Sequence, residues 1–268
     1  MKASPTESWI SEYWSQGFTL VRGVFGSEDV RILQAAFEDV LKKAQSFQKT
    51  TKEGLTEYRV VPIQGKPVFK FAKWASASYT TLNAYRTDPR LMHFARTLLG
   101  DDLRQITNQM HYKNPGDGVS FQFHQDCTFR KPDSAYRNLF RSFVQIGIAV
   151  DASTSENGCL RFIPASHRSG DLGLGGYEGE EADALNASIL APFGAPIEAL
   201  MEPGDLVLWN AYTVHGSQPN RSAHARRVYI NGFAKTVDCD HGIETLRKKE
   251  IMPLRWGQET LWDHVEER

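Results

Sequence analysis

The part of the chain beyond Gly100 limits the possible folds most strongly, because short strand-like runs alternate there with turn signals. Two of the turns place a proline before a glycine, at 114–117 and 202–205. The predicted strands lie at 104–113, 119–124, 142–151, 158–163, 205–210 and 226–235. Many short strands that follow an N-terminal run of helices favour an antiparallel β-fold buttressed by those helices.

The region before Gly100 has the residue pattern of helices. A short helix is predicted from about 5 to 16, followed by a strand at 18–22. A longer helix begins near Ser27, the expected N-cap, and another begins at Asp88-Pro89 and ends at Gly100. The apolar residues at helical spacing in the longer helix are Val30, Leu33, Phe37, Val40, Leu41 and Ala44. We expect these helices to cover one face of the sheet.

Two segments are predicted to have little regular structure. Residues 45–67 are polar and contain two glycines and two prolines, which indicates a mobile segment. Residues 170–184 are rich in glycine and acidic residues, which is typical of a surface loop or lid. The sequence has no internal repeat and no interdomain linker, so we expect one domain.

Charge and cysteine content exclude several classes of protein. The 268 residues carry a formal net charge of −1, whereas a general polyanion binder is strongly basic, so no nucleic-acid partner is expected. The three cysteines are odd in number and form no C-x-x-C pair, which favours a reducing, cytoplasmic location over a disulfide scaffold. No apolar run is long enough for a signal peptide or a membrane span.

His124 and Asp126 form an H-x-D pair on a predicted strand, where alternate side chains share a face. His215 must come from a distant strand, as the closure of a barrel permits. Two imidazoles and one carboxylate on one face of an octahedral ion are the ligand set of non-haem Fe(II) oxygenases. With eight histidines in the chain, an H-x-D pair alone is a weak signal, and the prediction depends on the combination.

The other polar clusters receive a structural interpretation. His111, His167, His224 and His241 are expected to be ordinary core or surface histidines. The run Asp238-Cys-Asp-His241 resembles a second ligand cluster, but no distant partner residue is evident. We interpret it as a solvated surface segment.

Arg226 lies 11 residues beyond His215, after a short strand and a wide turn. A returning strand would bring it alongside His215, where a guanidinium can bind a carboxylate with two charge-assisted hydrogen bonds. Arg227 neighbours Arg226 on the strand and must therefore face the opposite side, and Arg221 is expected in the turn. Arg226 is the favoured anchor for an acidic co-substrate.

At this point the sequence resembles the phytanoyl-CoA dioxygenase family of Fe(II)/2-oxoglutarate oxygenases. The resemblance is ordered along the chain, and its more specific elements are Asn157-Gly-Cys-Leu160 and Pro164-Ala-Ser-His167. The matching segments are Gly17–Phe25, Tyr112–Gly116, His124–Asp126, Glu156–Arg161, Ile163–Arg168, Pro203–Asp205, His215–Ser217 and Arg226.

The resemblance implies a mainly β fold, a double-stranded β-helix (a cupin-like jelly roll) with the N-terminal helices packed on one sheet. Within a single domain at 1–268, we expect a helical buttress and lid at 1–103, a jelly-roll core at 104–240 and a C-terminal extension at 241–268. Iron would be bound by His124, Asp126 and His215. The residues implied for 2-oxoglutarate are Arg226, Ser217, Gln109 and Lys70.

The activity implied is oxidation, most simply hydroxylation, of an unactivated C–H bond by dioxygen, with release of succinate and CO₂. The expected substrate is a small molecule such as an amino acid, an organic acid or a natural-product intermediate, and the protein would be a monomer or homodimer without a membrane partner. Candidate substrate contacts after the H-x-D pair are Phe129, Arg130 and Arg137. Two alternatives remain open: a jelly-roll isomerase or hydrolase that uses another divalent ion, and a non-catalytic jelly-roll binding module.

Overall fold

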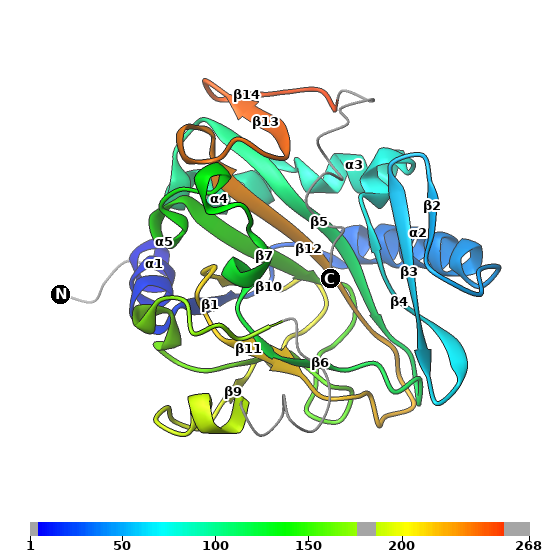
Figure 1. Cartoon of the computed structure of the whole chain (residues 1–268). Helices are drawn as coiled ribbons and strands as arrows, with labels where there is room; N and C mark the ends of the chain where they lie inside the picture. Colours follow the sequence, from blue (N-terminus) through cyan, green and yellow to red (C-terminus); the bar gives the residue numbers. More distant parts are fainter. Residues whose placement is uncertain (1–4, 176–185, 255–268) are drawn as a thin grey trace.

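The computed structural model describes residues 5–175 and 186–254, and it consists of two antiparallel sheets with helices on one side (Figure 1). The small sheet has the order β6 (Phe121–His124), β11 (His215–Ser217), β8 (Arg161–Phe162) and β9 (Ile197–Glu198). The large sheet has the order β1 (Phe18–Val21), β10 (Leu206–Trp209), β7 (Phe143–Ala149), β12 (Arg226–Lys235), β5 (Leu103–Lys113), β4 (Lys66–Lys73), β3 (Thr56–Ile63) and β2 (Thr51–Glu53). In addition, β13 (Ile243–Arg247) pairs with β5, and β14 (Glu250–Ile251) pairs with β13. This is the predicted jelly roll.

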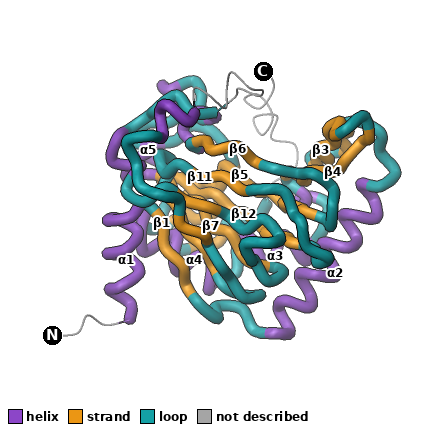
Figure 2. Tube along the Cα trace, turned by 90° about the horizontal axis from the view of Figure 1, so that it is seen from below, coloured by secondary structure: helices purple, strands orange, loops and turns teal. Residues whose placement is uncertain are grey.

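The helices cover the side of the large sheet that faces away from β6 and β11 (Figure 2). These helices are α1 (Pro5–Gln16), α2 (Ser27–Ala44), α3 (Thr80–Arg86) and α4 (Pro89–Leu99). The short α5 (Leu139–Ser142) lies outside this layer and packs against Cys127 and Ala211. The main core lies between α2, α4 and the sheet, where Phe37 packs on Tyr112 and Tyr229. The Tyr112 hydroxyl donates to the Phe37 carbonyl at 2.9 Å, so the apolar contact also satisfies its polar atom.

The helix ends follow the sequence signals with one difference. Asp88 caps α4 by accepting a hydrogen bond from the Arg90 amide at 2.8 Å, and Pro89 takes the first helical position, as predicted. In α2 the cap is Gly26, and the predicted cap Ser27 is the first helical residue. The Asp29 carboxylate, at the third helical position, accepts from the Gly26 amide, which is the carboxylate half of a capping box.

The prediction that residues 45–67 have little regular structure was wrong, because 51–53 and 56–63 are strands and β4 begins at Lys66. Gly54 and Gly65 have φ values of 58° and 77°, and they form the turns of two successive hairpins. Alternate side chains of β3 and β4, among them Tyr58 and Phe69, are buried in the main core. The glycines therefore connect strands that extend the sheet.

The other predicted strands are present, although β8 is reduced to two residues. The sequence did not reveal α3, α5, β9, β13 or β14, most of which are short, whereas the strand expected to carry His215 is β11. The predicted loop at 170–184 is described only to residue 175, and residues 176–184 lie outside the described part, as do 255–268 of the C-terminal extension. Among the described residues, no helix combines the length and apolar character that a membrane crossing requires.

Candidate metal centre and its surroundings

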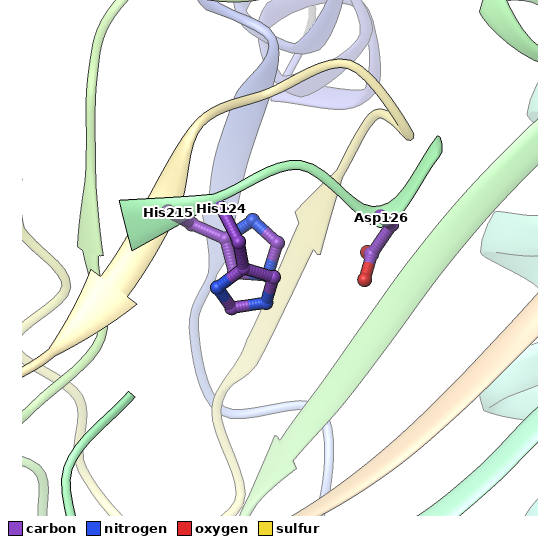
Figure 3. Close-up of side chains that lie close together, drawn as sticks. All are labelled: His124, Asp126 and His215. Atoms are coloured by element: carbon purple, nitrogen blue, oxygen red, sulfur yellow. The ribbon is translucent and has the colours of Figure 1, made fainter. Parts of the chain in front are cut away.

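His124, Asp126 and His215 converge on one point between the sheets. β6 and β11 pair so that His124 lies directly opposite His215, and Asp126 follows at the start of a short 3₁₀ turn (Asp126–Phe129). One donor atom from each residue lies within 4.8 Å of the others. Figure 3 shows the two imidazole rings together and the carboxylate beside them. This is the only group of three or more potential metal ligands among the described residues, and it is the predicted set.

Hydrogen bonds hold each of the three side chains in the orientation that a metal requires. The backbone carbonyls of Gln122 and Thr213 accept from Nδ1 of His124 and His215, at 2.7 and 2.9 Å. A carbonyl can only accept, so the proton stays on Nδ1 and the lone pair of Nε2 faces the centre. Asp126 Oδ2 accepts from the Trp209 indole N–H at 2.8 Å. Such outer partners fix the geometry of a metal's ligands.

The electrostatics of the site also suit a cation. His215 and Asp126 are 4% and 7% exposed. Burial, together with the neighbouring His215, lowers the pKa of His124 to about 4, so this imidazole is neutral at physiological pH. A metal binds the neutral imidazole and the ionised carboxylate, so the donor set fits a divalent ion such as Fe(II).

Arg226 begins β12 and is 1% exposed. Its Nη2 donates to the Gly158 carbonyl at 2.7 Å, and its Nε is buried without a hydrogen-bond partner among the described residues. Burial lowers the pKa of Arg226 to about 10, and the side chain still carries its charge at neutral pH. A buried guanidinium without a carboxylate partner is a site for an anion.

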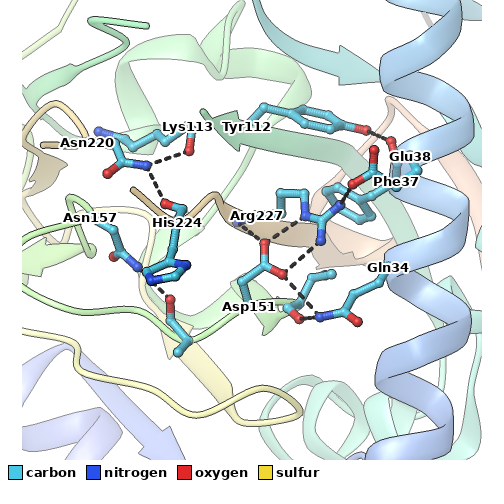
Figure 4. Close-up of polar contacts among 12 residues, drawn as sticks. Gln34, Phe37, Glu38, Tyr112, Lys113, Asp151, Asn157, Asn220, His224 and Arg227 are labelled. Carbon is cyan, nitrogen blue, oxygen red and sulfur yellow. Dashed lines mark hydrogen bonds and ion pairs between the residues drawn. The ribbon is translucent and has the colours of Figure 1, made fainter. Parts of the chain in front are cut away.

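Arg227 faces the opposite side of the sheet, as the alternation of side chains predicted. Its guanidinium binds Asp151 at 2.7 Å and also contacts Glu38 of α2 (Figure 4). Arg221 lies in the turn before β12. Of the three arginines, Arg226 is therefore the one that lies on the same face of β12 as the interior of the jelly roll.

Lys113 and His111 lie on the same face of β5 near Arg226, and burial lowers the pKa of both side chains. Neither residue was singled out as a site residue from the sequence. Lys113 lies opposite Arg226 in the sheet, and its ammonium donates to the Gln218 carbonyl. Burial, followed by the charge of Arg226, lowers the pKa of Lys113 to about 6. His111 stacks between Phe71 and Phe121. The two-residue alternation of β5 starting from Gln109 would have placed both on the same face.

The remaining predicted co-substrate residues lie around this end. Gln109 shares a 2.8 Å hydrogen bond with His111, and Lys70 lies over the Phe121 ring at 4.4 Å. Ser217 is buried on β11, and its hydroxyl has no hydrogen-bond partner among the described residues. An unpaired hydroxyl on the same strand as His215 fits the binding of a polar ligand, whereas the roles of Gln109 and Lys70 stay predictions.

The structure separates the three candidate substrate residues. Phe129 is 48% exposed, and its ring lies in a T-shaped arrangement with His124, with the ring centroids 5.8 Å apart. Arg130 points inward and donates to the Thr107 hydroxyl at 2.7 Å. Arg137 instead pairs with Asp240 at 2.6 Å on the surface. The interpretation of 238–241 as a solvated run was therefore only partly right, because Cys239 is buried.

Three comparisons place the chain among known proteins. The model of the phytanoyl-CoA dioxygenase (PhyH) family matches residues 13–228. A methylphosphonate hydroxylase from Gimesia maris is 34% identical over 243 residues, which is 90% of this chain and 85% of the relative. A probable alpha-ketoglutarate-dependent hypophosphite dioxygenase from Stutzerimonas stutzeri is 24% identical over 234 residues, 83% of this chain and 76% of the relative.

The solved structures agree on the fold. EctD from S. alaskensis, crystallised with 2-oxoglutarate and 5-hydroxyectoine, matches with a TM-score of 0.70 and 20% identity. The match covers 97% of this chain and 86% of that chain. At this identity the likeness establishes the shared architecture, which is the cupin-like jelly roll.

Proposed function

Because this chain belongs to the phytanoyl-CoA dioxygenase family of Fe(II)- and 2-oxoglutarate-dependent dioxygenases, we propose that it hydroxylates an unactivated C–H bond of a small molecule. The co-products are succinate and CO₂. The observation that carries the proposal is the combination of a buried His-Asp-His set with an unpaired buried guanidinium. An iron centre supplies the activation of dioxygen, and 2-oxoglutarate supplies two electrons for it.

Each residue has a distinct part in this proposal. His124, Asp126 and His215 hold the iron on one side and leave the opposite side open to 2-oxoglutarate and dioxygen. Arg226 binds the distal carboxylate of 2-oxoglutarate, and Ser217 donates a hydrogen bond beside it. Trp209 holds the Asp126 carboxylate in place. The apolar walls around the centre exclude water from the reaction.

The unpaired charge of Arg226 favours this function over the two alternatives. An isomerase or hydrolase that uses a divalent ion needs no anionic co-substrate, and a degenerate binding module has no reason to keep a buried, unpaired cation. Burying a charge without a partner costs on the order of several kcal/mol. A bound dicarboxylate offsets that cost.

The names of the relatives suggest which substrate classes should be tested first. The similar proteins from Gimesia maris and Stutzerimonas stutzeri are named for methylphosphonate and hypophosphite. We therefore place small phosphonates first in a substrate screen, followed by organic acids and amino acids. Hydroxylation is the simplest outcome of the proposed chemistry.

The test is a screen of oxygen uptake and succinate formation with purified protein, Fe(II) and 2-oxoglutarate. A substrate should increase both rates together, and mass spectrometry should find a product that is heavier by one oxygen atom. Omission of iron or of 2-oxoglutarate should abolish both signals. Product formation that continues without oxygen, or without 2-oxoglutarate, would show that the reaction belongs to another class.

A further inference from the structure

A second polar cluster lies on the same inner face of the large sheet, farther along β12 from Arg226. Four residues lie directly opposite one another across neighbouring strands of the large sheet, so they share one face. From β10 to β5 they are Trp209, Gln145, Gly232 and Thr107. Trp209 at the start of this row holds the metal-site carboxylate of Asp126 through its indole N–H. The row therefore extends from the candidate metal centre across the sheet.

Arg130 contacts Thr107, the residue at the other end of the row. It follows the 3₁₀ turn that begins at Asp126, and its Nη2 donates to the Thr107 hydroxyl at 2.7 Å. Its guanidinium lies 5.3 Å from the ring centre of Phe143, which is two residues before Gln145 on β7. Arg130 Nε is buried and has no hydrogen-bond partner among the described residues. Arg130 thus carries a positive charge that the protein leaves incompletely paired.

Gln145 provides an independent observation at the same place. It is 4% exposed, and its Oε1 is buried without a hydrogen-bond partner among the described residues. Its amide lies over Gly232, where an added Cβ would meet Oε1 at 2.0 Å and Thr107 Oγ1 at 2.9 Å. A glycine at this position therefore lets the two polar side chains approach each other. The amide group can turn to offer either its oxygen or its NH₂ to a ligand.

Lys73 lies beside this region as the ion-pair partner of Glu57. It lies in the adjacent row, opposite Gln109, and its side chain is 13% exposed. Glu57 partly neutralises it at 3.5 Å. Burial is the main cause that lowers the pKa of Lys73, and repulsion from the charge of Arg130 contributes to the shift. Arg130 is therefore close enough to Lys73 for an electrostatic interaction. Because Glu57 pairs with Lys73, its carboxylate does not neutralise Arg130, and the Arg130 guanidinium can bind an anionic ligand.

We propose that Arg130, Gln145 and Thr107 bind the anionic head group of the substrate, and that the substrate is a small organic oxyanion. This inference rests on the proposed function, and it adds a second anion site on the side of the metal centre away from Arg226. Gly232 and Arg226 are six residues apart on β12, about 20 Å along an extended strand. A five-carbon diacid cannot span that distance, so the two cationic ends serve two different acids.

Calorimetric titration of the anaerobic protein loaded with Fe(II) and 2-oxoglutarate tests the inference. The probes are methylphosphonate, propionate and the neutral dimethyl ester of methylphosphonate. At least one anion should bind, and the neutral ester should not. Arg130→Met should weaken binding of that anion roughly 10- to 100-fold, as expected for a lost charged hydrogen bond.

Gln145→Glu preserves the shape of the side chain and adds a carboxylate beside Arg130, so it should also weaken the anion. Lys131→Met is the matched control, because it removes one positive charge from the neighbouring residue, whose side chain is 57% exposed. It should change the affinity by no more than about twofold. The visible absorption band that forms when 2-oxoglutarate joins the iron reports an intact fold in every variant.

The outcomes separate this inference from the proposed function. Absence of the 2-oxoglutarate band in the parent protein contradicts the proposed function. Three results would overturn the anion site alone when the 2-oxoglutarate band is normal. Neither anion binds, the neutral ester binds as well as the anion, or the anion affinity is unchanged in Arg130→Met and Gln145→Glu.

Discussion

Arg226 and Arg227 are sequence neighbours whose removal should have opposite effects. Burial lowers the pKa of Arg226 from 12.5 to about 10, which at about 1.4 kcal/mol for each tenfold corresponds to roughly 3 kcal/mol against the charged form. Because the folded-state value is the lower one, this cost is fully present at neutral pH. Arg226→Met removes the cost but leaves the Gly158 carbonyl unpaired, which costs about 1–3 kcal/mol. The two terms nearly cancel, so the stability without 2-oxoglutarate should change little.

The affinity for 2-oxoglutarate should fall strongly in the same variant. Loss of one partner of a buried, hydrogen-bonded charge pair costs about 2–5 kcal/mol, or roughly 30- to several-thousand-fold in dissociation constant. The iron should remain bound, because the residues that would hold it are His124, Asp126 and His215 and not Arg226. Anaerobic calorimetry with Fe(II)-loaded protein measures this change directly.

Arg227→Met is the matched control with the opposite expected result. It removes the cation that pairs with Asp151 on the outer face and, among the described residues, leaves only the Gln34 amide and the backbone N–H of residue 227 as donors to that carboxylate. The expected cost is about 3 kcal/mol, the lower end of the range for a broken buried pair. The melting temperature should fall by roughly 6–12 °C for a protein of this size, with 2-oxoglutarate affinity unchanged. The reasoning is refuted if Arg227→Met weakens 2-oxoglutarate as much as Arg226→Met does, or if Arg226→Met is the variant that loses stability.

Three further predictions follow from the same geometry. Asp126→Ala should abolish succinate formation in the oxygen-uptake assay, and turnover equal to the parent contradicts its assignment as a ligand. Trp209→Phe removes the hydrogen bond to Asp126 and should weaken metal binding roughly 10- to 100-fold in a competition titration with a chelator, whereas unchanged affinity would deny the indole its orienting role. Burial and the charge of Arg226 lower the pKa of Lys113 to about 6 in the folded protein, compared with 10.5 in the unfolded chain. Between these two pH values the unfolded chain binds more protons at this lysine, so the free energy of unfolding without 2-oxoglutarate should rise with pH. The rise should be smaller in Lys113→Met. Binding of 2-oxoglutarate at pH 8 should therefore take up a proton at Lys113, which calorimetry in two buffers of different ionisation enthalpy measures; equal proton uptake in Lys113→Met would exclude this lysine as the source.

The features predictable from the sequence were those governed by local spacing. The alternation of side chains on a strand put His124 and Asp126 together and assigned Arg226 and Arg227 to opposite faces. Turn residues located most of the strands after Gly100. In each case, residues close in the sequence determine the outcome.

The features that the sequence did not reveal depend on contacts between distant segments. Lys113 lies beside Arg226 only because of the register of β5 against β12. Arg130 and Arg137 look alike on one loop, but the first meets Thr107 in the interior and the second meets Asp240 at the surface. Local pattern cannot distinguish such pairs, because their partners come from strands and turns far away in the chain.

The most direct test of the account is a crystal structure of the protein with 2-oxoglutarate and Mn(II), which replaces Fe(II) without supporting turnover. The account predicts a single anomalous peak bound by His124, Asp126 and His215, with the distal carboxylate of 2-oxoglutarate on Arg226. A metal ion bound elsewhere, or a carboxylate held by a different cation, would contradict it.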